Sequence, residues 1–170
     1  MTDHFDRLGQ PRRYAVDLDA IEREYLSRSR LVHPDLHTGD EQARHEESAE
    51  LNKAYQTLTD PFRRAEYYLS LLGGPSAREE KAQDQAFLME MMELRERFEE
   101  VAGNPAEIAK AEAELEDRLN LVQNHVSQLF GKVESMGSVS PAGLLAIRKQ
   151  LNAAKTLQSL LRGLSDPGID

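Results

Sequence analysis

The chain has 170 residues, a formal net charge of −9 and no cysteine. This length suits one ordinary domain or two small ones. The lack of cysteine excludes disulfides, zinc–thiolate sites and cysteine nucleophiles within the chain, and the acidic balance argues against a nucleic-acid-binding protein. No apolar run approaches the length of a membrane span, and residues 1–6 do not resemble a signal peptide. We therefore expect a soluble cytoplasmic protein without membrane contact.

Every long segment is predicted to be helical, so the expected fold class is all-α. The first long helix should start after Asp17, a favourable N-cap residue, and run from Leu18 to Val32. Pro34 should end it, because proline lacks an N–H donor and disfavours helix in the residue before it. Its apolar side combines residues at helical spacing: Leu18, Ile21, Tyr25, Leu26 and Val32.

Two further helices complete the predicted N-terminal domain, residues 1–74. One runs from about Asp40 to Leu58, and the other opens at Asp60-Pro61, where proline suits the first helical position. The stretch Gly73-Gly74-Pro75-Ser76 ends the last of these helices. Clustered glycine and proline make this stretch the best candidate for a domain boundary.

Residues 80–170 are predicted to form an antiparallel bundle of three helices. Their expected ranges are Asp84 to Ala102, Pro105 to Phe130, and a last helix opening at Pro141. Apolar residues recur at helical spacing in each, and the connections are short or moderate, as in such bundles. The seam of the first helix comprises Phe87, Met91, Leu94, Phe98 and Val101.

The tripeptide His33-Pro34-Asp35, between two helices of the right pattern, resembles the signature of a J-domain. That module docks on 70-kDa heat-shock chaperones of the DnaK/HscA class and stimulates their ATPase. The resemblance implies that the tripeptide contacts the chaperone, together with Arg28 and Arg30 and with Arg23 in support. A basic patch on an acidic chain favours docking to an acidic partner surface, although a merely solvated helix face is the plain alternative.

Three further blocks resemble the HscB family, the specialised J-domain co-chaperones of iron–sulfur cluster assembly. They are residues 51–58 (Leu-Asn-Lys-Ala-Tyr-Gln-Thr-Leu), residues 64–71 (Arg-Ala-Glu-Tyr-Tyr-Leu-Ser-Leu) and Phe87-Leu88-Met89-Glu90 followed by residues 93–96. The resemblance implies a non-enzymatic adaptor without cofactor or metal. Such an adaptor is a monomer that binds an IscU-type iron–sulfur scaffold and brings it to an HscA-type chaperone.

The client site can also be placed from helix geometry, since a helix turns about 100° per residue. Leu88, Met89 and Met92 then point away from the predicted seam, beside the acidic residues Glu93, Glu96 and Glu100. Exposed apolar groups rimmed by charge often mark an interaction site, and methionine adapts to a partner's surface. The same positions match the family's client-binding residues. Scattered exposed hydrophobic residues of no function are the alternative.

The chain departs from the family at several positions. Leu36 follows the tripeptide where many J-domains carry lysine, and Asn152 and Ala153 stand near a place where bacterial members can carry an aromatic residue that helps hold the client. Two other functions stay open: a general protein-folding J-protein that serves DnaK, and a metal-dependent helical-bundle enzyme. A metal site at His33, Asp35 and His37 is disfavoured, because the loop offers no fixed groups that would hydrogen-bond the three side chains and hold them in position.

Overall fold

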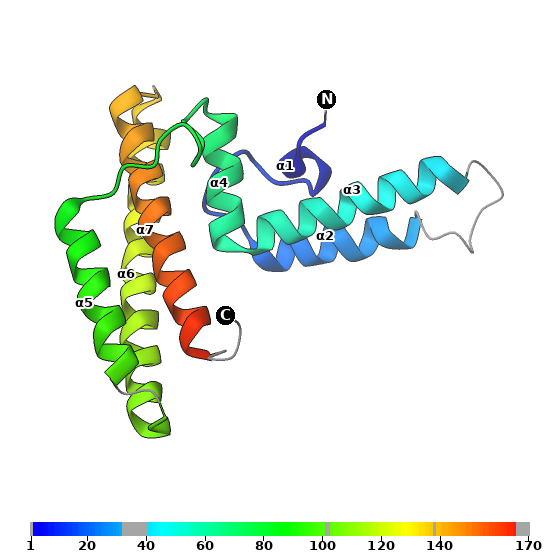
Figure 1. Ribbon diagram of the computed structural model, residues 1–170. Coiled ribbons are helices and arrows are strands. Elements are labelled where there is room, and N and C mark those ends of the chain that lie inside the picture. Colours follow the sequence, from blue (N-terminus) through cyan, green and yellow to red (C-terminus); the bar gives the residue numbers. More distant parts are fainter. Residues whose placement is uncertain (1, 32–40, 101–102, 138, 166–170) are drawn as a thin grey trace. The chain divides into compact units, whose positions relative to one another are not determined.

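A computed structural model describes residues 2–31, 41–100, 103–137 and 139–165. Within these ranges every regular element is a helix, which confirms the all-α fold class (Figure 1). The chain divides into two compact units, Met1–Tyr68 and Leu69–Asp170. None of the described helices is both long and apolar enough to cross a membrane.

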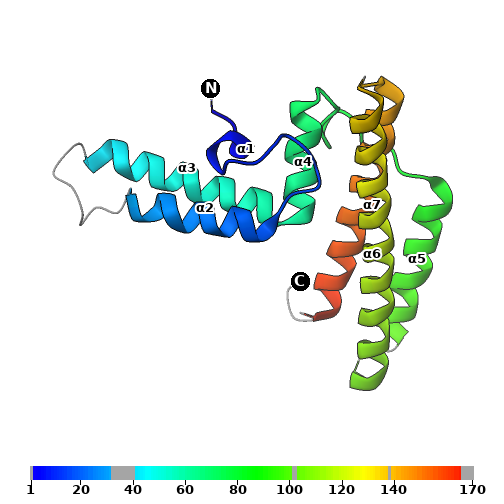
Figure 2. The ribbon, with the colours of Figure 1, turned by 180° about the vertical axis from the view of Figure 1, so that it is seen from behind.

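The N-terminal unit contains α1 (His4–Arg7), α2 (Leu18–Leu31), α3 (Glu41–Thr59) and most of α4 (Pro61–Leu71). Helices α2 and α3 lie side by side in both views (Figures 1 and 2), and α1 packs on α3. The predicted caps are confirmed, because Asp17 accepts from the backbone N–H of Ala20 at 3.0 Å and Asp60 from that of Arg63 at 2.7 Å. The short helix α1 was not predicted, since four residues carry no periodic pattern.

The core of this unit is formed by apolar residues from all four helices and from the segment between α1 and α2. Its buried members are Phe5, Leu8, Tyr14, Ile21, Leu51, Ala54, Leu58, Ala65 and Tyr68. The sequence predicted too wide an apolar side for α2, since Leu18 and Leu26 are 50% and 47% exposed and do not belong to the core. Helix α2 packs chiefly against α3, and Tyr25 stacks on Tyr55 with ring centroids 4.2 Å apart. A single packing partner buries only a narrow stripe of a helix.

The second unit contains α5 (Gln85–Glu100), α6 (Pro105–Met136) and α7 (Pro141–Ser165), and α6 packs along α7 (Figure 2). Helix α6 continues to Met136 where the sequence suggested an end at Phe130. Buried Val126, Phe130 and Val133 extend its apolar stripe past Gly131, and this packing outweighs the low helix propensity of glycine. Gly137, with φ of +62°, provides the left-handed residue that ends the helix.

The core of the bundle joins all three helices. Met91, Leu94 and Phe98 of α5 are buried against Ala111 and Leu115 of α6 and Leu157 of α7. Burial of each large apolar side chain contributes roughly 1.5–3 kcal/mol to stability. This seam fixes which side of α5 faces inward, and its opposite side remains on the surface.

Candidate functional site

The structure describes only some of the residues expected to contact a chaperone. His33, Pro34 and Asp35 lie outside the described residues, as does Leu36. Arg23 and Arg30 are exposed on α2, and within the part of the chain that the structure describes neither has an acidic partner. They are seven residues apart, which is about two helical turns, so they share one face. Arg28 lies on another side of α2, where its Nε is 2.5 Å from Oε1 of Glu24.

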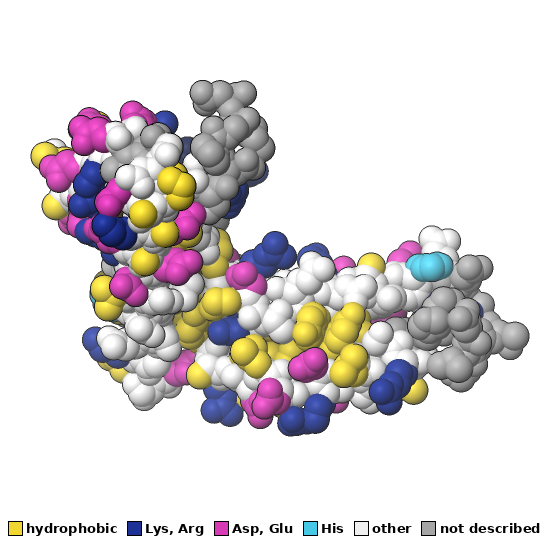
Figure 3. All heavy atoms as spheres, turned by 90° about the horizontal axis from the view of Figure 1, so that it is seen from below, with side chains coloured by type: hydrophobic (Ala, Val, Ile, Leu, Met, Phe, Trp, Pro, Cys, Tyr) yellow, Lys and Arg dark blue, Asp and Glu magenta, His cyan; other side chains and the backbone are white. Residues whose placement is uncertain are grey.

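The side of α2 opposite Arg23 and Arg30 contacts α3. The hydroxyl of Tyr25 donates to Oδ1 of Asn52 at 2.8 Å, next to the Tyr25–Tyr55 stack. Figure 3 shows hydrophobic side chains gathered along the arm formed by α2 and α3, with charged side chains around them. This arm is therefore a rigid, partly apolar surface with cations on it, which suits docking of an acidic partner.

Reversing the two exposed arginines that share a face, Arg23→Glu with Arg30→Glu, should slow association with a 70-kDa chaperone about tenfold at low salt and flatten its salt dependence, because steering charges act through the long-range field. Stopped-flow binding at several salt concentrations measures this. The control is Arg63→Glu with Arg78→Glu, two exposed arginines elsewhere that give the same change in net charge. Equal slowing by both pairs would show a general effect of charge and no docking role for α2.

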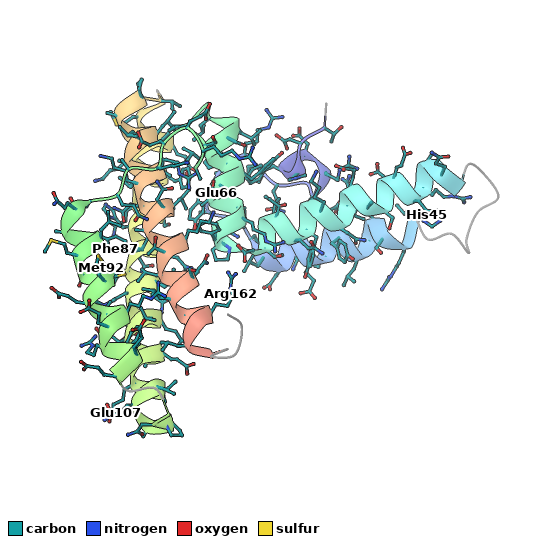
Figure 4. The ribbon with its side chains drawn as sticks, viewed as in Figure 1. His45, Glu66, Phe87, Met92, Glu107 and Arg162 are labelled. Atoms are coloured by element: carbon teal, nitrogen blue, oxygen red, sulfur yellow. The ribbon has the colours of Figure 1, made fainter. Side chains whose placement is uncertain are left out.

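The outer face of α5 carries every residue expected to contact a client. Leu88, Met89 and Met92 are 43%, 57% and 64% exposed, although each is large and apolar. The three acidic residues Glu93, Glu96 and Glu100 are exposed beside them. Figure 4 labels Met92 on this helix, together with Phe87, which packs partly buried against the core of the bundle. An acidic rim around adaptable apolar side chains can bind a partner that offers apolar groups and cations.

A network of ion pairs holds α5 against α6 without using this outer face. Arg97 of α5 donates to both carboxylate oxygens of Glu114, at 3.1 and 2.9 Å. Arg118 of α6 donates to Glu90 of α5 and to Glu114 at 3.1 Å. The hydrogen bond to Glu90 is the main reason that the pKa of Arg118 is raised. These pairs lie at the flank of α5 that meets α6, so they fix the helix and leave its outer face open.

Asn152 and Ala153 do not lie on the surface. Both are 8% exposed, and Asn152 donates through Nδ2 to the carbonyls of Glu80, at 3.1 Å, and Ala82, at 3.4 Å. Its own carbonyl accepts from Nε2 of Gln83 at 2.9 Å. The segment before α5 therefore covers Asn152, and neither buried position offers a client anything like an exposed aromatic ring. Sequence patterns did not predict this contact, because irregular segments carry no periodicity.

No group of three or more His, Cys, Asp or Glu side chains that could hold a metal is found among the described residues. His33, Asp35 and His37 lie outside them. His45, on α3 in Figure 4, and His125, on α6, are exposed.

Comparison with known proteins gives the class of the chain. The DnaJ domain matches residues 3–68, and the HSCB C-terminal oligomerisation domain matches residues 83–157. The structure is similar to "Chaperone HscB from Vibrio cholerae", with 28% identity, 97% of this chain and 96% of that chain covered, and a TM-score of 0.79. Together these matches define a J-domain protein with a second, HscB-type helical domain.

Two more distant structures share the fold. Human co-chaperone protein HscB has 24% identity, with 96% of this chain and 80% of that chain covered and a TM-score of 0.80. The Jac1 co-chaperone from Saccharomyces cerevisiae has 21% identity, 100% and 97% coverage, and a TM-score of 0.75.

The chain belongs to the HscB family of J-domain co-chaperones. This family is non-enzymatic, so the alternative of a metal-dependent enzyme is wrong. A J-domain implies a 70-kDa heat-shock chaperone as partner.

Proposed function

We propose that this chain binds an iron–sulfur scaffold protein of the IscU type, delivers it to an HscA-type chaperone and stimulates that chaperone's ATPase. The observation that carries the proposal is the exposed apolar face of α5, Leu88, Met89 and Met92, in a chain that also holds a J-domain. A helix that served only the bundle core would not need three large apolar residues on its outer side. The HSCB match and the similarity to Vibrio cholerae HscB support the same partners.

The proposed roles are divided between the two units. His33, Pro34 and Asp35 contact the chaperone, proline fixing the backbone while histidine and aspartate present a donor and acceptors. Arg23, Arg28 and Arg30 of α2 steer the approach, with Arg28 the weakest contributor because it is paired with Glu24. On α5, Leu88, Met89 and Met92 bury against the client, and Glu93, Glu96 and Glu100 attract cations on it.

Stimulation follows from differential binding. The chain can accelerate ATP hydrolysis by its partner only if it binds the hydrolysis-competent conformation of the chaperone more tightly than the resting one. Client bound at α5 adds to this effect, because a tethered client reaches the chaperone at a high effective concentration. The chain itself holds no nucleotide and performs no chemistry in this scheme. It acts as a monomer in the cytoplasm, a location with which its lack of cysteine is compatible.

The test is the rate of single-turnover ATP hydrolysis by an HscA-type chaperone. The chain alone should accelerate hydrolysis, and the chain with an IscU-type scaffold should accelerate it by at least a further factor of ten. A reduced, unfolded protein in place of the scaffold should give no such gain. Equal gains with both, or stimulation of DnaK but not of the HscA type, would support the general protein-folding alternative.

A further inference from the structure

Two adjoining hollows lie between α7 and the segment that leads into and through α5. The first, about 410 Å³, is lined on the α7 side by Asn152, Lys155, Thr156 and Ser159. The second, about 440 Å³, lies further along between the end of α5, the start of α6 and the end of α7. Ser159 lines both hollows, so they are neighbours along α7, and together they are called the groove below.

The second hollow is lined largely by apolar side chains and has unfilled space beside Gly163. Phe98, Ile108, Leu160 and Leu164 line it, and Phe98 is only 6% exposed. Gly163, on α7 next to the Arg162 labelled in Figure 4, also lines it, and a Cβ atom added there meets nothing within 4 Å. A glycine inside a helix weakens that helix, so a side chain at this position would help folding but would enter the hollow.

The hollow continues the outer face of α5. Leu88, Met92, Arg95 and Glu99 follow one another at intervals of four, three and four residues, so they form one stripe along the helix. Arg95 and Glu99 stand at the rim of the second hollow, paired with each other at 3.4 Å. A partner that covers Leu88 and Met92 therefore reaches the hollow within about two helical turns along the same stripe.

Charge along the groove is arranged unevenly. Lys81 and Lys155 line the first hollow, and no carboxylate is among the described residues that line it. The outer face of α5, of which no described residue lines the first hollow, carries Glu93, Glu96 and Glu100. A partner is thus favoured if it has an acidic group near the lysines and an apolar group in the second hollow. Cations on the same partner would meet the glutamates of α5.

We propose that the client surface extends from α5 into the second hollow, where one bulky apolar side chain of the bound scaffold inserts between Phe98, Leu160 and Gly163. The identity of the client rests on the proposed function, whereas the hollow and its continuity with Leu88 and Met92 do not. A buried apolar anchor of this kind usually supplies a large share of binding energy, because it lies in a desolvated pocket inside a ring of polar contacts. The charged pair Arg95–Glu99 forms part of that ring.

The hollow can be filled without harming the fold. Gly163→Leu should weaken scaffold binding at least tenfold by occupying the space, while the melting temperature stays the same or rises. The matched control is Gly131→Leu on α6, also an exposed helical glycine at which an added Cβ meets nothing within 4 Å, but away from the groove. Calorimetric titration with the scaffold should show unchanged affinity for this control.

A labelling experiment reports on the hollow itself. The chain has no cysteine, so Gly163→Cys and Gly131→Cys each introduce a single thiol. Bound scaffold should slow maleimide modification at position 163 at least tenfold and leave the rate at position 131 unchanged, as followed by mass spectrometry of this chain.

The outcomes separate this inference from the function on which it rests. If the unmodified chain fails to bind the scaffold, the proposed function is wrong. If it binds, and alanine at Leu88, Met89 and Met92 weakens binding but Gly163→Leu does not, only the extension into the hollow is wrong. A change from dimer to monomer on Gly163→Leu, seen by light scattering, would assign the hollow to a second copy of the chain and overturn the proposal.

Discussion

Replacing Leu88, Met89 and Met92 together by alanine is expected to weaken scaffold binding at least tenfold, which corresponds to about 1.4 kcal/mol. The three side chains are 43%, 57% and 64% exposed, so they contribute little to the bundle core and are free to bury against a client. Alanine is a strong helix former, so α5 should persist. Titration calorimetry measures the affinity, and thermal unfolding by circular dichroism checks that the melting temperature is unchanged.

A matched control removes similar apolar surface from the same unit. Leu121 and Met136 of α6 and Val139, which precedes α7, are 68%, 71% and 43% exposed, and none of them belongs to α5. Their joint replacement by alanine should leave scaffold affinity within a factor of two. If the α5 variant unfolds while its residual folded fraction binds normally, these residues serve the core and the client binds elsewhere.

The second large effect concerns the tripeptide. His33→Gln or Asp35→Asn should remove at least nine-tenths of the chain's stimulation of chaperone ATP hydrolysis, because each change alters the hydrogen-bonding or charged groups offered to the chaperone while keeping side-chain size. Scaffold affinity should stay the same, since the client binds the other unit. Single-turnover hydrolysis measured over a range of chain concentrations gives the loss directly.

His45→Gln and His125→Gln provide the controls for this experiment, since both histidines are exposed and lie outside the tripeptide. Each should stimulate hydrolysis like the unmodified chain. Normal stimulation by His33→Gln or Asp35→Asn would contradict the J-domain mechanism for this protein, however well the chain folds.

Helices with strong signals were predictable from the sequence. Asp17 and Asp60 carry capping groups that the structure uses, and Pro61 and Pro141 open α4 and α7 as expected. Proline and capping residues act through local backbone chemistry, so their effect does not depend on distant packing. The burial of Met91, Leu94 and Phe98 likewise follows from helical spacing alone.

Other features depend on contacts between distant residues and could not be predicted in this way. Leu18 and Leu26 fit an apolar pattern but remain exposed, because α2 has one main neighbour. Helix α6 passes Gly131 because Val126, Phe130 and Val133 are buried on both sides of it, whereas the glycine by itself indicated an end. The burial of Asn152 under Glu80 and Ala82, and the hollow at Gly163, need the folded chain.

Recovery of partners from a native cell extract tests most directly the claim that one chain bridges a chaperone and a scaffold. After brief cross-linking in the presence of ATP, the unmodified chain should recover both an HscA-type chaperone and an IscU-type scaffold. The Asp35→Asn variant should recover the scaffold but little chaperone. The variant with alanine at Leu88, Met89 and Met92 should recover the chaperone but little scaffold. Loss of both partners from either variant, or recovery of a broad set of unfolded proteins in place of the scaffold, would contradict the account.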